Sequence, residues 1–423
     1  MPENRPFRAL QYDTARVALV DVVAPPYDVI DPDYQNRLYD RSPYNIIRLI
    51  LGRDADRYAE ASRHLEAWKN EGVLVRDKDP AMYVLEQEFQ AADGHRLKRR
   101  GIIAACRVDD FSAGTILPHE RTLSKPKEDR FRLLQATNTN FSQIFSLYAD
   151  PDGTVESILR NAVSSPPIMQ VVFEEVINRV WRIGDEGLIL TLSATIRDRT
   201  ALIADGHHRY ETALAYRDLM RLKAKQHSGN EPYEFTMMFF AGMESEGLTV
   251  LPTHRVVQQL QGFQPDTFVE RLKHAFEVRK AENVGNVLNS LNTGKGSAFG
   301  MLIGQSAYFL RLKDTSTLAA LIDDSIPAEV RELDVTILHT YILEDLLGIS
   351  KDAQERKLNL DYLKTAEEVE RAVEAGRAQI GFLLNPTRLE QVRRVTRAGY
   401  TMPQKSTFFH PKLVSGLLLN PLE

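Results

Sequence analysis

The chain of 423 residues has a single cysteine, Cys106. One cysteine cannot form an intrachain disulfide, so the fold depends on its apolar core. Cys106 lies in the apolar run GIIAACRV, where a thiol typically packs as a small buried side chain. We therefore expect a structural thiol and a reducing, cytoplasmic compartment.

Long apolar runs and an excess of one charge are also missing. No stretch approaches the roughly 18 apolar residues of a membrane helix, and the start, MPENRPFRAL, lacks the apolar segment of a signal peptide. The 53 Lys and Arg are balanced by 58 Asp and Glu, a net charge of −5. The composition thus predicts neither a membrane nor a nucleic-acid partner, and it carries no signal of the oligomeric state.

Several familiar site motifs are missing as well. The chain contains no GxGxxG, no HEXXH and no paired CXXC, and TGKGS at 293–297 fails the GxxxxGK pattern because Asn289 stands where its first glycine belongs. No internal repeat or low-complexity run is present. A Rossmann site, a Walker site and the common zinc sites are therefore not indicated.

Apolar periodicity predicts mixed helices and strands. NIIRLIL at 45–51 is typical of a buried strand, 54–74 of an amphipathic helix, and the first ADGH, at 92–95, of a hairpin turn. PIMQVVFEE and INRVWRI predict two paired strands. Further helices are expected near 265–275, 327–346, 365–377 and 387–398, and strands at FEVRK, FGMLI, AYFLRLK and QIGFLL. The expected division is into domains 1–247 and 248–423.

The second ADGH stands in a different setting, IADGHHRY at 203–210. The apolar run TALIA precedes it and a helical pattern follows, so the sequence predicts a strand-to-helix turn whose N–H groups and dipole attract an anion. Candidate phosphate-binding residues are Asp205, Gly206, His207, His208 and Arg209. The simpler alternative is a helix capped by Asp205. A metal site is a third reading, although adjacent helical residues point about 100° apart.

Three polar loops add candidates. The rigid PPYD presents Tyr27 and Asp28, and PHER presents His119, Glu120 and Arg121 ahead of a helix. Near the C-terminus, MPQKST supplies Lys405, Ser406 and Thr407, a hydroxyl-rich and cationic set that suits a phosphorylated or carboxylated ligand.

PFRALQY, VAPPYDVI, LPHERTLSKPKEDR, IADGHHRYETAL, LPTHRVV and MPQKSTFFHPKLVSGL together resemble the bacterial and archaeal domain-of-unknown-function 1015 family, over nearly the whole chain. IADGHHRYETA also resembles the signature of the ParB/sulfiredoxin superfamily, which includes free-serine kinases. The resemblance implies an α+β fold: a ParB/sulfiredoxin-like mixed core with inserted hairpins and an additional C-terminal α/β region.

From the motifs and this resemblance we expect a phosphotransferase that uses a nucleotide (ATP or ADP) or pyrophosphate with Mg²⁺ on a small hydroxylated metabolite, serine by analogy. The turn at 205–209 would hold phosphates, and Asp28 or Glu120 would be the base, with His208 also catalytic. Arg121 or Lys405 would neutralise charge. Alternatives are a phosphatase, a nucleotide-gated regulatory or DNA-associated protein, and a metal-dependent hydrolase using His119, His207 and His208.

Overall fold

The computed structural model describes residues 2–91, 93–122, 124–294, 296–314 and 321–423. The chain forms two compact units. The first unit comprises Met1–Pro118, Thr122–Thr249 and Pro411–Glu423, and the second comprises His119–Arg121 and Val250–His410. Both combine helices with β-sheets, which confirms the α+β class. Among the described helices, none has the length and apolar character needed to cross a membrane.

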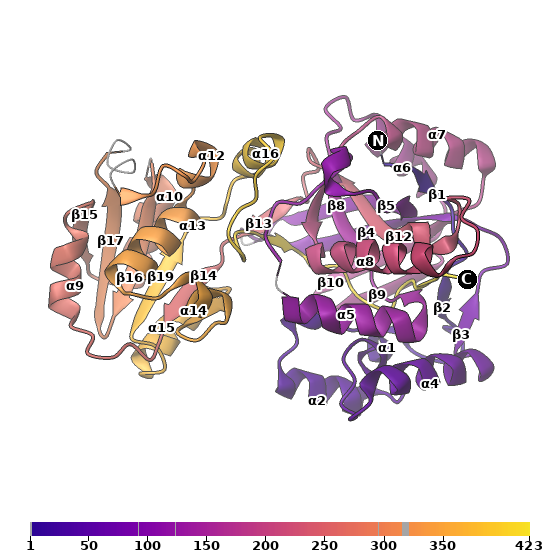
Figure 1. The fold of residues 1–423 in the computed structure, drawn as a ribbon, viewed down its shortest axis with the longest axis horizontal. Coiled ribbons are helices and arrows are strands. Elements are labelled where there is room, and N and C mark those ends of the chain that lie inside the picture. Colours follow the sequence, from indigo (N-terminus) through magenta and orange to yellow (C-terminus); the bar gives the residue numbers. More distant parts are fainter. Residues whose placement is uncertain (1, 92, 123, 295, 315–320) are drawn as a thin grey trace. The chain divides into compact units, whose positions relative to one another are not determined.

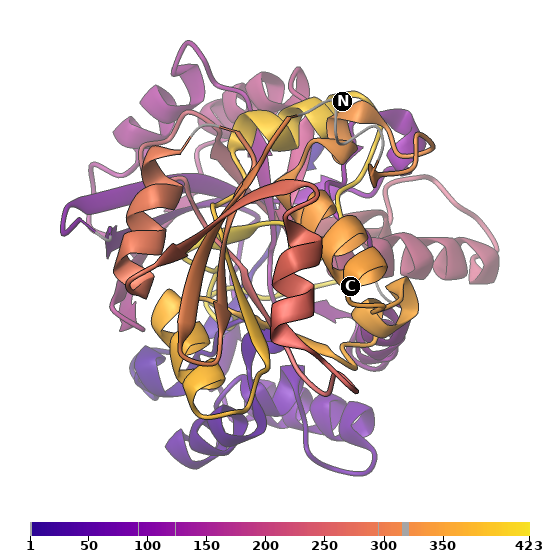
Figure 2. The same ribbon diagram turned by 90° about the vertical axis from the view of Figure 1, so that its left-hand side faces the viewer.

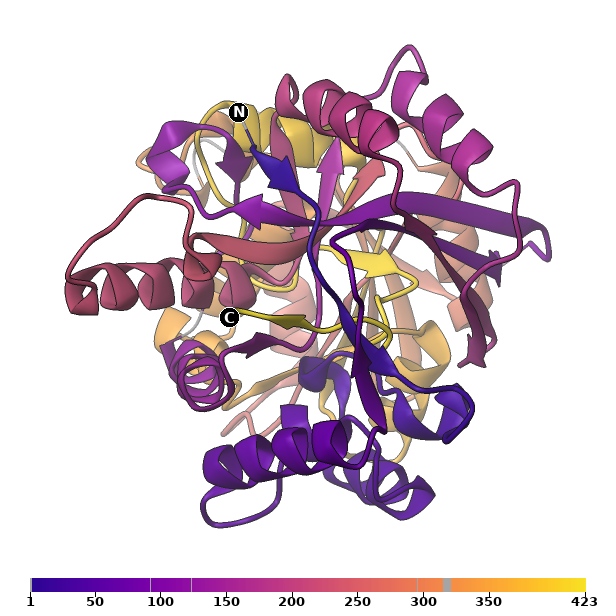
Figure 3. The ribbon, with the colours of Figure 1, turned by 90° about the vertical axis from the view of Figure 1, so that its right-hand side faces the viewer.

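A nine-stranded sheet organises the first unit, in the order β6-β11-β8-β12-β5-β4-β10-β9, with β1 paired to β5 (Figure 3). Most of its pairs are antiparallel, whereas β11 is parallel to β6 and β12 is parallel to β8. The strands are β1 (Asn4–Arg5), β4 (Met82–Gln90), β5 (Arg96–Arg107), β6 (Ile116–Leu117), β8 (Ile144–Tyr148), β9 (Met169–Phe173), β10 (Val176–Ile183), β11 (Ala201–Asp205) and β12 (Phe235–Gly242). Two small ladders pair β2 (Leu10–Tyr12) with β3 (Leu74–Arg76), and β7 (Thr139–Asn140) with β21 (Asn420–Pro421).

One buried apolar cluster joins this sheet to α6 (Thr154–Ala162), α7 (Glu186–Arg197) and α8 (His207–Lys223). Alternate residues of β5 face it, Ile102, Ala104 and Cys106, so the cysteine is the buried structural thiol that the sequence predicts. Helix α5 (Ser124–Thr137) runs beside α8 (Figure 1). The remaining helices are α1 (Leu19–Val22), η1 (Tyr27–Val29), α2 (Pro32–Arg41), α3 (Ile47–Ile50), α4 (Arg57–Asn70), η2 (Phe111–Ala113) and η3 (Pro232–Glu234).

Both predicted hairpins are present. Strands β4 and β5 pair across the first ADGH, where Gly94 has a positive φ, although Ala92 lies outside the described residues. Strands β9 and β10 pair across Glu174 and Glu175, which both take positive φ angles, as a tight hairpin turn requires. The predicted strand NIIRLIL is wrong: it forms the buried helix α3. Asn45 accepts a hydrogen bond from the N–H of Ile47 and so starts a helical turn that an apolar run alone does not reveal.

The second unit has a six-stranded sheet in the order β15-β17-β16-β19-β14-β18 (Figure 2). Its strands are β14 (His254–Val257), β15 (Phe276–Ala281), β16 (Ala298–Ile303), β17 (Ser306–Leu312), β18 (Leu360–Leu363) and β19 (Ile380–Leu384), and they include the four that the sequence predicts. The short strands β13 (Thr249–Leu251) and β20 (Phe408–His410) form a separate ladder.

Helices cover both faces of this sheet. One apolar cluster packs α10 (Val284–Thr293) and α15 (Ala366–Glu374) on one face. On the other, Phe276 lies against Tyr341 of η4 (Leu338–Leu346), which is wound as a π-helix. The predicted helix 327–346 is thus broken into α12 (Ala328–Arg331), α13 (Asp334–Ile337) and η4. The other helices are α9 (Pro265–Leu272), α14 (Lys351–Glu355) and α16 (Leu389–Arg397).

Candidate functional site

The second ADGH forms the strand-to-helix turn that the sequence predicts. Asp205 ends β11, Gly206 turns the chain with a φ of 96°, and α8 begins at His207. Helix α8 runs for 17 residues, and its N-cap is a glycine, which has no side chain to satisfy the first-turn N–H groups. The positive end of a long helix therefore lies at the end of an inner strand of the sheet.

The carboxylate of Asp205 pairs with two cationic side chains and lies near a third. Arg209 donates from Nη2 to its Oδ2 at 2.6 Å, and Lys412 Nζ contacts Oδ1. The side chains of Asp205, Arg209 and Lys412 are nearly buried, each about 15% exposed or less. Arg99, fully buried on β5, is the third cation; burial lowers its pKa to about 9, and nearby Asp205 acts in the opposite direction. We call Arg99, Asp205, Arg209 and Lys412 the basic cluster; its four side chains are three cations and one carboxylate.

Arg209 also lines a cavity of about 60 Å³ within the first unit. That volume suits one or two waters or a single small anionic group, since a water takes about 30 Å³. Two cavity-lining hydroxyls, Thr212 Oγ1 and Ser415 Oγ, are buried and have no hydrogen-bond partner among the residues that the structure describes. Gln143, whose carbonyl accepts from Arg209, is also buried, and within the same residues neither polar atom of its side chain is hydrogen-bonded. Buried groups of this kind normally have partners, so a polar ligand or water belongs here.

Tyr27 lines the same cavity as Arg209. The guanidinium of Arg130 lies 4.1 Å from the Tyr27 ring centre, and burial raises the pKa of Tyr27 to about 12. Asp28 follows in the 3₁₀ turn η1 and is exposed. On α8, His207 is buried and His208 is half-buried. The structure therefore brings Tyr27 and Arg209 together at one cavity, with Asp28 next to Tyr27 in the chain.

The remaining candidates belong to the second unit. His119 is fully buried, and its Nε2 lies 2.7 Å from Thr407 Oγ1. Glu120 accepts hydrogen bonds from the N–H and the hydroxyl of Thr407 at 3.0 and 3.2 Å. Ser406 is buried and donates to the carbonyl of Pro403 at 2.6 Å. Two predicted loops are thus joined at Thr407 by hydrogen bonds within the chain.

Two other residues of these loops differ in exposure. Arg121 is exposed, whereas Lys405 is half-buried and has a φ of 54°. The Lys405 carbonyl accepts from Arg255 Nη2 at 2.9 Å. The backbone at Lys405 is therefore held in place while Arg121 presents its charge to solvent.

Replacing Gly206 by alanine should impair both folding and anion binding. A Cβ there would lie 2.9 Å from Arg209 Cζ, Nε and Nη2, and a φ of 96° is strained for any L-residue. We expect a loss of about 1–3 kcal/mol in the free energy of unfolding, measured with urea, and weaker pyrophosphate binding, measured by calorimetry.

Gly153→Ala is the matched control for that variant. Gly153 also precedes a helix with a positive φ, but no atom of the described residues lies within 4 Å of its added Cβ. Gly153→Ala should therefore lose only the free energy of unfolding that backbone strain costs. Unchanged pyrophosphate binding by Gly206→Ala would mean that the position of Arg209 does not matter for anions.

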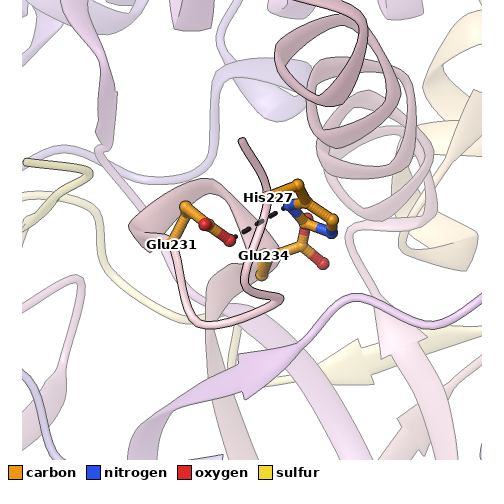
Figure 4. A group of neighbouring side chains, drawn as sticks. All are labelled: His227, Glu231 and Glu234. Atoms are coloured by element: carbon orange, nitrogen blue, oxygen red, sulfur yellow. Dashed lines mark ion pairs between the residues drawn. The ribbon is translucent and has the colours of Figure 1, made fainter. Parts of the chain in front are cut away.

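One group of three potential metal ligands occurs among the described residues, His227, Glu231 and Glu234 in the segment after α8 (Figure 4). His227 Nδ1 lies 3.1 Å from Glu231 Oε2, and its Nε2 lies 3.6 Å from Glu234 Oε1. Arg221 donates to both oxygens of Glu234, and the backbone N–H groups of Ser228 and Gly229 donate to Glu231. These protein partners already satisfy both carboxylates, as in an ion-paired loop. His119, His207 and His208 do not belong to this group.

A model of the family described as "Protein of unknown function (DUF1015)" matches residues 5–336 of this chain. No curated protein matches it. Solved structures are similar at low identity: a conserved hypothetical protein from Pyrococcus furiosus (14% identity, TM-score 0.36, covering 74% of this chain and 92% of that one) and a free serine kinase in complex with AMP (14%, 0.36, 73% and 86%). A third is C-terminally truncated SbnI from Staphylococcus aureus (12%, 0.38, 76% and 87%). These structural similarities are remote.

Proposed function

The chain belongs to the DUF1015 family, and we propose that it is a phosphotransferase whose phosphate donor binds at the turn between β11 and α8. One observation carries the proposal: Arg209 and Lys412 both pair with the largely buried Asp205, near the buried Arg99, at the glycine-capped start of a 17-residue helix. Buried positive charge is costly unless anions compensate it. A phosphate group supplies that charge and accepts hydrogen bonds from the turn.

In this proposal the first-turn N–H groups and Arg209 hold the donor's phosphates, with Gly206 allowing close approach and His207 and His208 adding donors. Lys412 and Arg99 supply positive charge where the transferred group becomes more negative. Asp205 aligns Arg209 and Lys412 between ligands. The unpartnered hydroxyls of Thr212 and Ser415 offer further donors at the cavity.

The acceptor is a small hydroxylated metabolite, with serine the first to test because of the sequence resemblance. Its hydroxyl oxygen forms a bond to the terminal phosphorus as the bond to the donor's leaving oxygen breaks, and the hydroxyl proton passes to a carboxylate. Asp28, exposed beside Tyr27, is our first choice for that base, and Glu120 is the alternative. His119, Arg121, Lys405, Ser406 and Thr407 of the second unit are proposed to bind acceptor or phosphate.

The donor is proposed to be ATP, ADP or pyrophosphate with Mg²⁺. Magnesium usually takes one or two carboxylates, phosphate oxygens and waters. In the first unit Asp205 already pairs with two cations, so the ion would be held mainly by the donor's phosphate oxygens and by water. When bound, the ion would neutralise phosphate charge, while the residues of the turn orient the donor.

Phosphorus NMR of the purified protein tests this proposal directly. With Mg²⁺, a panel of ATP, ADP, CTP and pyrophosphate, and serine or phosphoserine, we expect either a new phosphomonoester or the loss of phosphoserine. Formation identifies a kinase, and hydrolysis without transfer identifies the phosphatase alternative. Arg209→Ala should lower donor affinity roughly 10- to 100-fold, because it removes hydrogen bonds to a charged group. Asp28→Asn should abolish turnover and retain donor binding.

Arg132→Ala is the control, since Arg132 is an exposed arginine of α5 paired only with Glu128 among the described residues. It should behave as the unmodified protein. No phosphorus signal change and no nucleotide or pyrophosphate binding across the panel would refute the phosphotransferase. Turnover unchanged in Asp28→Asn would remove that residue as the base.

A further inference from the structure

The second unit contains a cavity of about 460 Å³, well separated in the sequence from the turn at Gly206. This volume falls within the range of about 300–1,000 Å³ that small-molecule sites occupy. Its walls come from Arg121, α12, α13, η4, α14, Tyr362 of β18 and the loop at residues 399–404, all of which belong to the second unit; α12, α13 and α14 are labelled in Figure 1. The cavity is therefore large enough for a metabolite and is built by a single unit.

A buried hydroxyl on this wall has no partner among the described residues. Thr336 of α13 is 3% exposed, and its Oγ1 makes no hydrogen bond within the part of the chain that the structure describes. An unsatisfied buried hydroxyl costs about 1–3 kcal/mol relative to a paired one. A polar ligand in the cavity would satisfy it.

The wall also includes the π-helix η4, through His339, Thr340 and Glu344. π-Helical turns are rare and occur frequently at functional sites, because the wider turn places side chains where an α-helix would not. His339 is locked in one tautomer: its Nδ1 lies 2.8 Å from Gln354 Oε1, and its Nε2 accepts from Arg255 Nε at 3.3 Å. Burial lowers the pKa of His339 to about 3, so it is neutral.

Arg255 lies behind His339 as a buried cation. It is 1% exposed, and its hydrogen bonds go to neutral acceptors: His339 and the carbonyls of Thr253 and Lys405. Among the described residues, no carboxylate forms an ion pair with it. Burial lowers the pKa of Arg255, and nearby Tyr362 and Glu120 act in the opposite direction. A buried charge that is only partly compensated attracts a negative group into the neighbouring low-dielectric space.

The side chains that line the cavity carry both signs. Arg121 and Lys351 are basic, and Glu344 and Glu355 are acidic. Lys351 Nζ and Glu344 Oε2 are 3.9 Å apart, at the limit of an ion pair, so each remains available to a ligand. A simple anion would meet two carboxylates, and a simple cation would meet Arg121, Lys351 and the field of Arg255. A molecule with one group of each sign avoids both penalties.

We propose that this cavity binds a small zwitterion, an α-amino acid or a close derivative, through a carboxylate attracted to Arg121 and the buried Arg255 and an ammonium group attracted to Glu344. The hydroxyl of Thr336 forms a hydrogen bond with the same ligand. The proposal rests on the proposed function only in sharing Arg121 with the acceptor-binding residues, and amino-acid binding to this cavity is measured without any phosphate donor.

Ligand-observed NMR with the full chain tests the site, using the twenty standard amino acids and phosphoserine at millimolar concentration, followed by calorimetry on any hit. We expect at least one to bind. Its N-acetyl derivative, which lacks the ammonium charge, and its amide, which lacks the carboxylate, should bind at least about tenfold more weakly, since each loses one charged contact.

Two variants locate the binding. Thr336→Val keeps the shape of the buried side chain and removes its hydroxyl, and Glu344→Gln keeps the shape and removes the charge. Each variant should bind the zwitterion several-fold more weakly than the unmodified protein does, and Glu344→Gln should leave the affinity for the N-acetyl derivative unchanged. Glu374→Gln, at an exposed glutamate of α15, is the matched control. No binding by any amino acid up to about 10 mM, or binding that both variants leave unchanged, would overturn the proposal, and neither result bears on pyrophosphate binding at Arg209.

Discussion

Asp205→Asn should lose about 3 kcal/mol of its free energy of unfolding, and pyrophosphate should restore much of that loss. The substitution preserves the size of the side chain and removes the only carboxylate of the basic cluster. Arg209, Lys412 and Arg99 then repel one another in a largely buried place. Breaking a buried ion pair typically costs 3–5 kcal/mol, and we take the lower end because these side chains retain some exposure.

The recovery follows from binding linkage. A ligand that binds only the folded chain stabilises it by about 2.7 kcal/mol at a hundred times its Kd. In Asp205→Asn the anion no longer competes with a carboxylate for the cations, so pyrophosphate should bind the variant more tightly than the unmodified protein. The same substitution should therefore lower the stability of the ligand-free protein and raise its affinity for pyrophosphate.

Urea denaturation with and without 5 mM pyrophosphate measures both effects. Asp185→Asn is the matched control, because Asp185 is also an aspartate at a helix start but caps α7 through the N–H of Leu188 and has no cationic partner among the described residues. Asp185→Asn should lose less free energy of unfolding than Asp205→Asn, and pyrophosphate should not stabilise it. A destabilised Asp205→Asn that pyrophosphate does not rescue would show that the turn is not an anion site. An unchanged stability would show that Asp205 does not balance the cations.

The turn at Gly206 could be predicted from sequence because its signals are local. An apolar strand, a glycine and a helical pattern follow one another within twenty residues, and each limits the backbone by itself. The hairpins between β4 and β5 and between β9 and β10 were predictable for the same reason. Local signals failed at NIIRLIL, where an apolar run is compatible with a strand or a buried helix and Asn45 decides by a side-chain hydrogen bond.

Local signals identified Asp205 and Arg209 but could not bring the other two members of the basic cluster, Arg99 and Lys412, to them. Arg99 lies in RLKRRG, which has the composition of an exposed strand, yet the sheet buries it completely. Lys412 comes from a C-terminal segment that belongs to the first unit, some two hundred residues after Asp205. One available clue was Pro411, since a proline-flanked lysine beside apolar residues is poorly suited to a solvated strand. Contacts between distant segments depend on the whole topology, which periodicity does not specify.

The second unit should lose stability when the pH falls from 6.5 to 4.5. Two of its histidines are neutral in the folded chain, because burial and the nearby Arg255 cation lower the pKa of His254 to about 4 and that of His339 to about 3. Glu367 and Glu368 act in the opposite direction on His254, and Gln354 does so on His339, but less strongly. In the unfolded chain both should titrate near 6.5.

The sign follows from proton binding. Between pH 6.5 and 4.5 the unfolded chain binds protons at both histidines and the folded chain does not, so acid favours unfolding. Each histidine contributes about 1.4 kcal/mol per pH unit in this window. Asp334 opposes them, because burial raises its pKa to about 6 and the folded chain therefore takes up its proton first, a gain of about 2 kcal/mol by pH 4.5. The expected net loss is about 3 kcal/mol.

Pulsed hydrogen exchange at peptide resolution, corrected for intrinsic rates, measures this loss in the second unit. Fluorescence reports on the first unit alone, because Trp68 and Trp181, the two tryptophans of the chain, both lie there. His254→Asn retains an acceptor for the N–H of Leu384 and removes the titration, so it should reduce the acid sensitivity by about 1.4 kcal/mol per pH unit. His274→Asn, at an exposed histidine of the same unit, should change nothing. A profile in which His254→Asn remains as acid-sensitive as the unmodified chain would mean that His254 is not the buried neutral base that the structure indicates.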